Sequence, residues 1–224
     1  MLIDIKNILN KFHIKPLGVI HLGAHKGEEL KLYKKLNIKN ILLYEANKKL
    51  INYLKFKSTI FNFIFDMNIK IINKVIYDKK KSICKLNITS NSQSSSILDL
   101  GIHKELYPNI VKEEEVLVEG NTLDDEFSNF YNINNYNFLN IDIQGAELLA
   151  LLGAQTILNK LDIIYTEINY DYVYKNCALV ADIDNLLKKY NFVRYYTSDV
   201  KNKKNISVWG DAIYLKKKLV QKYN

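Results

Sequence analysis

The sequence has few of the residues that usually divide or cross-link a chain. It contains two cysteines, Cys84 and Cys177, which lie far apart and match neither a disulfide framework nor a metal-ligand spacing. It contains two prolines, Pro16 and Pro108, and no linker rich in glycine and serine. A chain of 224 residues without such a break is expected to fold around a single core.

Long apolar runs are also missing. No segment reaches the roughly 18 apolar residues that a membrane-spanning helix needs. Residues 1–17 place apolar side chains at helical spacing, but Asp4, Lys6 and Lys11 interrupt them. This pattern predicts an amphipathic N-terminal helix rather than a secretion signal, so we expect a cytoplasmic protein without a membrane span.

Arginine is nearly absent, although the chain is basic. The net charge is +8, the isoelectric point is about 9.2, and Arg194 is the single arginine. Proteins that bind nucleic acid rely on arginine for bidentate contacts to phosphates and bases. Lysine, asparagine, isoleucine and tyrosine are frequent throughout and have AT-rich codons, which explains the lysines at least as well. The composition therefore argues against nucleic acid as a partner.

What the chain does contain is an alternation of apolar strands and amphipathic helices. Helix-like segments lie between many of the strands, at 26–37, 146–158 and 178–190. The alternation predicts an α/β fold with a mostly parallel sheet that helices cover on both faces. The predicted strands are 19–24, 40–46, 69–77, 137–143, 162–168, 192–197 and 211–216.

The domain boundaries follow from the same pattern. We expect an N-terminal helix in 1–17, a single domain over 18–217 and a tail over 218–224. Residues 82–89 alternate between polar and apolar side chains, which predicts an additional edge strand. The polar and acidic region 90–125 is interpreted as a loop-rich insertion that crosses one end of the sheet.

A glycine turn follows the first predicted strand. In GVIHLGAHKGEE, Gly23 and Gly27 come just before a helix, where backbone amides face a ligand. The P-loop pattern is missing, and the dinucleotide pattern fails because His25 and Glu28 replace two of its glycines. The spacing from Gly23 to Gly27 better fits a loop that binds S-adenosylmethionine (SAM). On this loop alone, a metal site at the histidines and a plain strand end stay open.

Acidic residues end three of the predicted strands. Glu45 lies about 20 residues after Gly23, where ribose hydroxyls bind in nucleotide-binding folds, although a solvent-facing glutamate is the alternative. Asp142 ends one strand just before a turn at Gly145, and Glu167 ends the next strand. Because ligands bind at the carboxyl ends of strands in open α/β sheets, we expect these acids to face a ligand.

Together these segments resemble the FkbM family of SAM-dependent methyltransferases. The resemblance covers roughly residues 18–217 and is carried by VIHLGAHKGEE, LLYEAN, NSQSSSIL, NTLDD, FLNIDIQGAELLALLGA, IIYTEIN and WGDAIYLKK. IDIQGAE followed by LLGA is its most specific part. The resemblance implies a Rossmann-like class I methyltransferase sheet whose last strand, in WGDAIYLKK, is antiparallel. It also implies SAM as cofactor and methyl transfer to a hydroxyl of a sugar, nucleotide-sugar or glycan.

The expected site follows from both lines of reasoning. The expected cofactor contacts are Gly23, Ala24, His25, Gly27, Glu45, Ser95 and Asp142. Asp142 is the first candidate for the general base that takes the acceptor's proton, and at an ordinary pKa of ~3.9 it is ionised. His25 is the second candidate, with a loop contact to SAM as its alternative role. Glu167 orients the acceptor, or it holds a divalent ion together with Asp142.

Two other functions fit the sequence less well. An RNA ribose 2′-O-methyltransferase would place a lysine on the strand after Asp142, where this chain has Glu167. A binding module that kept the SAM fold without catalysis is the second alternative, because His21 and His25 depart from the common form of the cofactor loop.

Overall fold

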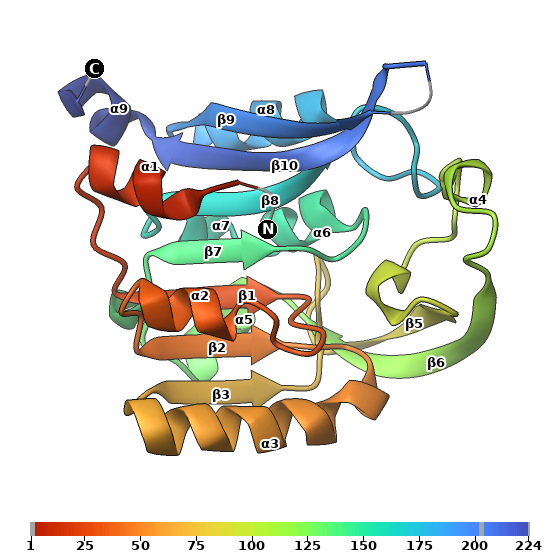
Figure 1. Cartoon of the computed structure of the whole chain (residues 1–224), viewed down its shortest axis with the longest axis horizontal. Helices are drawn as coiled ribbons and strands as arrows, with labels where there is room; N and C mark the ends of the chain where they lie inside the picture. Colours follow the sequence, from red (N-terminus) through yellow and green to blue (C-terminus); the bar gives the residue numbers. More distant parts are fainter. Residues whose placement is uncertain (1–2, 202–203, 224) are drawn as a thin grey trace.

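A seven-stranded sheet forms the centre of the molecule (Figure 1). The structure is a computed structural model that describes residues 3–201 and 204–223. Across the sheet the strands run β3 (Asn68–Ile72), β2 (Asn40–Tyr44), β1 (Gly18–Leu22), β7 (Phe138–Ile141), β8 (Ile163–Asn169), β10 (Ser207–Lys216) and β9 (Phe192–Lys201). The first five are parallel, and β10 is antiparallel to both of its neighbours. The predicted mostly parallel sheet with an antiparallel last strand is confirmed.

Helices cover both faces of this sheet, because its central strands are apolar on both sides. One face carries α1 (Ile5–Lys11), α2 (Leu30–Lys35), α3 (Lys48–Phe65) and α9 (Lys217–Tyr223). The other face carries α5 (Leu123–Asn129), α6 (Glu147–Leu152), α7 (Gln155–Leu158) and α8 (Val180–Lys189). Among the described residues, no helix is long and apolar enough to cross a bilayer.

Two of the predicted helices differ in extent from the sequence expectation. The helix expected at 26–37 begins only at Leu30, because the preceding turn uses positive φ angles at Gly23, His25 and Gly27. The helix expected at 146–158 is divided into α6 and α7 around Gly153, where a Cβ would lie 2.1 Å from the backbone oxygen of Tyr77, just after the short strand Val75–Ile76. The chain therefore bends where it must pass close to its neighbour.

A second, three-stranded sheet lies beyond the carboxyl ends of the parallel strands (Figure 1). It has the order β4 (Val75–Ile76), β6 (Lys112–Asn121) and β5 (Ser82–Thr89). The expectation of one strand over 69–77 is wrong, because β3 ends at Ile72 and β4 joins this other sheet. The expected insertion, 90–125, contains η1 (Ser92–Ser94), α4 (His103–Leu106), β6 and the start of α5.

The two ends of the described chain pack together on one face. Helix α1 lies within the expected N-terminal segment, and most of the expected tail belongs to α9. The rings of Phe12 and Tyr223 meet edge to face, with their centroids 6.5 Å apart. Both segments join the apolar layer on the face that carries α2 and α3.

Candidate active site

Two adjoining hollows lie at the carboxyl edge of the parallel strands. The smaller holds about 630 Å³ of empty space, and the larger holds about 1390 Å³. Both are lined by Gly23, His25, Gln93, Asp142 and Gln144. The arrangement can hold two ligands side by side, with Asp142 and Gln144 at their junction.

The turn after β1 packs directly against the end of β7. Gly23 has a φ of +85°, and a Cβ there would lie 1.8 Å from the backbone oxygen of Asp142, so no larger residue fits. Gly27 also has a positive φ, and its carbonyl accepts a hydrogen bond of 2.7 Å from Lys57 Nζ. Of the expected cofactor contacts, Gly23 lines both hollows, whereas buried Ala24 and Gly27 shape the turn and line neither hollow in the described structure.

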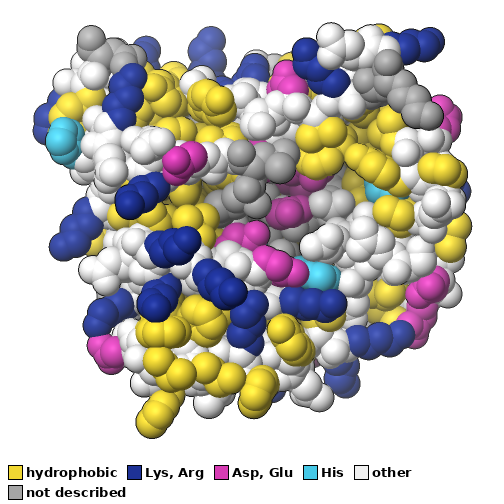
Figure 2. All heavy atoms as spheres, viewed as in Figure 1, with side chains coloured by type: hydrophobic (Ala, Val, Ile, Leu, Met, Phe, Trp, Pro, Cys, Tyr) yellow, Lys and Arg dark blue, Asp and Glu magenta, His cyan; other side chains and the backbone are white. Residues whose placement is uncertain are grey.

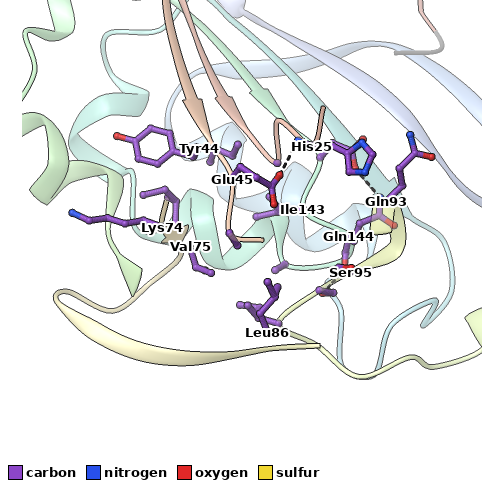
Figure 3. Close-up of a pocket in the computed structure, with 18 of the residues that line it drawn as sticks. His25, Tyr44, Glu45, Lys74, Val75, Leu86, Gln93, Ser95, Ile143 and Gln144 are labelled. Atoms are coloured by element: carbon purple, nitrogen blue, oxygen red, sulfur yellow. Dashed lines mark hydrogen bonds between the residues drawn. The ribbon is translucent and has the colours of Figure 1, made fainter. Parts of the chain in front are cut away.

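Glu45 stands at the end of β2, buried at the rim of the smaller hollow (Figure 3). Its Oε2 accepts a hydrogen bond of 2.7 Å from the backbone N–H of His25. Its Oε1 accepts a hydrogen bond of 2.7 Å from the backbone N–H of Asn47. Burial raises the pKa of its carboxyl above the ordinary value, and the two backbone N–H groups partly offset this. Each oxygen keeps a second lone pair, so the carboxylate can still accept two hydroxyls.

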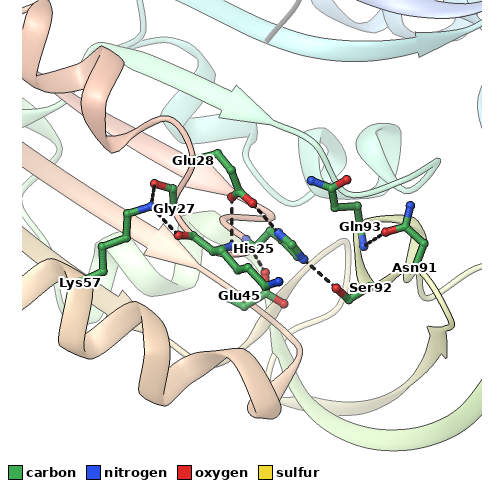
Figure 4. Close-up of polar contacts among 9 residues, drawn as sticks. His25, Gly27, Glu28, Glu45, Lys57, Asn91, Ser92 and Gln93 are labelled. Atoms are coloured by element: carbon green, nitrogen blue, oxygen red, sulfur yellow. Dashed lines mark hydrogen bonds and ion pairs between the residues drawn. The ribbon is translucent and has the colours of Figure 1, made fainter.

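His25 connects the glycine turn to the serine-rich segment (Figure 4). Its Nδ1 lies 2.8 Å from Glu28 Oε1, and its Nε2 lies 2.8 Å from Ser92 Oγ. Ser95, from the same segment, lines the smaller hollow, and its Oγ accepts a hydrogen bond from the N–H of Thr89. Because both ring nitrogens of His25 have partners, the side chain fixes the segment across the hollows.

His21 lies at the wall of the larger hollow but is held by other side chains. It is buried in β1, and its Nδ1 lies 3.1 Å from the hydroxyl of Tyr33. That hydroxyl accepts a hydrogen bond of 2.8 Å from Asn140 Nδ2, so its own proton points to His21. Burial lowers the pKa of His21, which keeps the imidazole neutral.

Three carboxylates form a row across neighbouring strands in the larger hollow. Asp211 of β10 pairs in register with Glu167 of β8, and Asp142 follows the β7 residue that pairs with Thr166. The side-chain amide of Gln144 lies between two of them. Its Nε2 donates to Asp142 Oδ1 at 2.7 Å and to Glu167 Oε2 at 3.2 Å. The two acids that the sequence placed on successive strand ends are thus brought together.

Tyr174 fixes the orientation of the Gln144 amide. Its hydroxyl donates a hydrogen bond of 2.6 Å to Gln144 Oε1, which leaves the amide nitrogen directed at the acids. Gln144 itself has a φ of +58°, and its backbone oxygen accepts a bond of 2.7 Å from Ser96 Oγ. The amide therefore acts as a rigid bridge between Asp142 and Glu167.

The expectation of an ordinary pKa for Asp142 is wrong. Its side chain faces the hollow, and protein groups surround it on the other sides. This partial burial disfavours the charged form and raises its pKa to about 6. The hydrogen bond from Gln144 lowers the pKa, whereas the nearby negative charge of Asp211 raises it. Burial, with Glu147 and Asp142 nearby, raises the pKa of Glu167 well above the ordinary value.

Glu147 is a further carboxyl with a raised pKa, and it lies behind the hollows. Only 1% of the residue is exposed, and its Oε1 accepts hydrogen bonds of 3.1 Å from the N–H groups of Ile143 and Gly145. Burial raises its pKa from 4.5 to about 7. Glu147 thus holds the turn that carries Gln144. Between pH 4.5 and about pH 7, Glu147 keeps its proton in the folded protein, whereas the unfolded chain has released it.

We expect Glu147→Gln to flatten the dependence of stability on pH. Since the folded pKa of Glu147 is raised, its ionisation destabilises the fold as pH rises from about 4.5 to about 7. A glutamine keeps the one accepting oxygen and does not titrate. Thermal unfolding should show that the free energy of unfolding falls less between pH 5 and pH 8 in the variant than in wild type, with a difference on the order of 3 kcal/mol. Exposed Glu113→Gln is the control, and an equal loss in wild type and Glu147→Gln would contradict the assignment.

Within the described ranges, 3–201 and 204–223, no group of three or more His, Cys, Asp or Glu side chains is arranged to hold a metal ion. Asp142 and Glu167, the pair considered for a divalent ion, have the amide of Gln144 between them. An amide nitrogen is a donor and does not ligate a hard cation. A metal at this pair would first have to displace or rotate Gln144.

The larger hollow is acidic and aromatic in a protein that is otherwise basic. Its lining includes Glu28, Glu29, Asp142, Glu167 and Asp211 together with Tyr107, Tyr174 and Trp209. No lysine or arginine among the described residues lines it. Figure 2 shows acidic side chains in the hollowed centre of this face, with lysines around them. The hollow therefore favours neutral or cationic ligands over anions.

Comparison with known proteins identifies the family. The sequence profile of the FkbM methyltransferase domain matches residues 21–194. The chain belongs to the FkbM methyltransferase family. A search of the curated proteins finds no match.

Solved structures share the fold at low sequence identity. The FkbM methyltransferase of Methylobacillus flagellatus KT superposes with a TM-score of 0.56 at 14% identity, over 88% of this chain and 43% of that one. Sp1610 of Streptococcus pneumoniae, a putative tRNA (m1A22) methyltransferase, gives 0.52 at 9% identity, over 96% and 71%. The magnesium protoporphyrin IX methyltransferase of Synechocystis PCC 6803, solved with bound SAH, gives 0.51 at 7%, over 95% and 79%.

The smaller hollow of this FkbM chain fits the adenosine part of SAM. Apolar side chains from β4, β5 and the insertion line it, among them Val75, Leu86 and Ile97, and they can enclose a flat ring (Figure 3). Glu45 at its rim has the free acceptor capacity that two ribose hydroxyls need. The residues present are therefore compatible with SAM.

Sequence reasoning missed Asp211 and Tyr174 and gave Gln144 no role. Asp211 carried a usable signal, because an acid within the apolar segment WGDAIYLK is as unexpected as Asp142 in FLNIDI. Tyr174 carried none. It reaches Gln144 from a loop after β8, and only the folded chain brings the two together.

Proposed function

We propose that the chain transfers the methyl group of SAM to a hydroxyl of an uncharged, polyhydroxylated acceptor such as a sugar or glycan. The single observation that carries this proposal is the larger hollow, which is lined by carboxylates and aromatic rings and meets the smaller hollow at Asp142. Carboxylates accept hydrogen bonds from sugar hydroxyls, and aromatic faces pack against the apolar side of a sugar ring.

In this proposal the smaller hollow binds the cofactor. Glu45 accepts the two ribose hydroxyls, and Val75, Leu86 and Ile97 enclose the adenine. Gly23 and Ser95 supply close backbone and hydroxyl contacts at the rim. His25 fixes the serine-rich segment over the ligand through Ser92, which is a binding role rather than the role of a base.

Asp142 is the proposed general base. Bound SAM supplies an electrophilic methyl group, and Asp142 takes the proton that the acceptor hydroxyl loses as its oxygen attacks. A pKa of about 6 leaves Asp142 ionised at neutral pH and makes it a stronger base than an ordinary aspartate. Gln144 holds one Asp142 oxygen, which leaves the other oxygen for the acceptor, while Glu167 orients a neighbouring hydroxyl.

The charge of the larger hollow argues against RNA and nucleotide-sugars as acceptors. Both carry phosphates, which the acidic lining would repel. The lysine that ribose 2′-O-methylation would need has no counterpart among the described residues that line the larger hollow, and Glu167 stands in its place on β8. A non-catalytic module would have no use for an aspartate with a raised pKa at the junction of two hollows.

Labelled SAM offered with matched acceptors tests the proposal. We expect methyl transfer to neutral oligosaccharides or glycosides and at least about tenfold lower kcat/KM for their phosphorylated counterparts, for nucleotide-sugars and for capped RNA. Equal or better use of the phosphorylated acceptors would contradict the acceptor class. Calorimetry without detectable SAM binding would instead contradict the enzyme as a whole.

A further inference from the structure

Helix α3 is apolar on two sides, and one of those sides faces solvent. Leu54 and Phe61 pack into the apolar layer against the sheet, and Ile51 is buried on the same side of the helix. Five large apolar residues on the opposite side are exposed, and Phe63 is exposed to 91%. They are Tyr53, Phe56, Ile60, Phe63 and Ile64. Their three- and four-residue spacing puts them in one stripe, which we call the α3 stripe.

The α3 stripe is a continuous patch rather than scattered exposure. Figure 2 shows hydrophobic side chains gathered along the lower edge of the molecule, where α3 lies in Figure 1. Exposed single apolar residues are common, but a patch of five on one helix usually marks an interaction surface. None of the five lines either hollow of the candidate active site in the described structure. The stripe therefore has no part in the proposed reaction.

Positive charge surrounds the stripe. Residues 48–65 contain four lysines and no Asp or Glu. Helix α2 adds three more lysines, and the Nζ of one of them, Lys34, lies 3.6 Å from the centroid of the Phe65 ring at the end of α3. Figure 2 shows lysines directly above the hydrophobic edge. An apolar stripe bordered by lysines is the pattern of a helix that lies in the surface of an anionic membrane.

We propose that the α3 stripe docks the protein on an anionic lipid surface, with its aromatic and aliphatic side chains entering the headgroup region. Charge decides between this partner and a second copy of the chain. Pairing two α3 helices through their stripes would bring eight α3 lysines together with no Asp or Glu in either helix, and of the four in each chain Lys49 is the one that an ion pair, with Glu114 of β6, offsets in the described structure. Phospholipid headgroups supply the missing negative charge near these lysines.

Vesicle co-sedimentation tests the proposal with the full chain. We expect binding to vesicles of phosphatidylcholine mixed with phosphatidylglycerol, weak binding to phosphatidylcholine alone, and loss of binding as salt is raised. The double variant Phe56→Ser/Phe63→Ser should bind the anionic vesicles at least about tenfold more weakly. Lys48→Glu/Lys55→Glu should weaken binding as well. SAM affinity should be unchanged in both, which shows that the fold is intact.

Matched controls lie on the opposite face of the sheet. Phe130→Ser removes a side chain that is 61% exposed after α5, and Lys188→Glu/Lys189→Glu reverses two exposed charges on α8. Both should bind vesicles like wild type. Absence of binding to anionic vesicles, or equal binding by the α3 variants, would overturn the proposal. Sedimentation velocity that shows a dimer dissolved by Phe56→Ser/Phe63→Ser would also overturn it, because the stripe would then be an interface between copies.

Discussion

Asp142→Asn should lower kcat by about 10²–10⁴-fold and leave SAM affinity nearly unchanged. The asparagine keeps the size of the side chain but cannot take the acceptor's proton. It still has an oxygen that can accept the hydrogen bond of 2.7 Å from Gln144. Single-turnover transfer from labelled SAM measures the chemical step, and calorimetry measures cofactor binding. The matched control is Asp78→Asn, which removes an exposed carboxylate away from the hollows.

The pH profile makes this prediction sharper. Because the base must be ionised, the wild-type rate should rise with pH through about 6 and then level off. The rise should disappear in Asp142→Asn. Removing the amide in Gln144→Leu should move the rise to higher pH, since the hydrogen bond from Gln144 lowers the pKa of Asp142. A near-wild-type rate in Asp142→Asn on the true acceptor would show that another group is the base.

The proposed base and the buried carboxyl behind it lower the stability of the folded protein near neutral pH. The pKa of Asp142 is raised to about 6 and that of Glu147 to about 7, so both ionise less readily in the folded state than in the unfolded chain. The contribution of these two carboxyls to stability is then highest on the acid side and falls as pH rises through this range. Activity rises over the same range. The proposed enzyme thus works where its acid cluster is partly ionised and its fold is less stable, a conflict common at functional sites.

The main sheet could be predicted because its strands are short apolar runs. Glu45 and Asp142 directly follow β2 and β7, and parallel strands necessarily bring such ends to one edge, whereas Glu167 lies two residues before the end of β8. The second sheet could not be predicted in this way. Strand β4 is two residues long and pairs with Gly120 and Asn121, more than 40 positions away, so no local pattern specifies it.

Helix α3 was missed for a different physical reason. Its outward face is as apolar as its inward face, so the one-sided periodicity that identifies an amphipathic helix is weak. The contacts of Gln144 were hidden because they depend on a positive φ and on Tyr174 from a distant loop. Helix α3 and the turn at Gln144 thus both depart from the pattern of an ordinary packed element. Each of them also supports one of the functional proposals made above.

Glu45→Gln should raise the dissociation constant of SAM by about 10–100-fold, although the substitution hardly changes size. Each oxygen of Glu45 accepts a backbone N–H, from His25 and from Asn47. A glutamine must turn its NH₂ group toward one of these donors, which leaves a buried N–H without an acceptor and lowers the stability of the turn with or without SAM. It also presents a donor where one ribose hydroxyl requires an acceptor.

Glu147→Gln is the matched control for this result, because the hydrogen bonds of Glu147 predict little change in SAM affinity. Both contacts of Glu147 go to one oxygen, Oε1, which a glutamine retains. Calorimetry with SAM and with its demethylated product should therefore show a large loss for Glu45→Gln and little change for Glu147→Gln. Thermal unfolding of both variants separates lost binding from lost folding. If folded Glu45→Gln binds SAM like wild type, Glu45 does not hold the ribose, and the cofactor must lie elsewhere along the edge of the sheet.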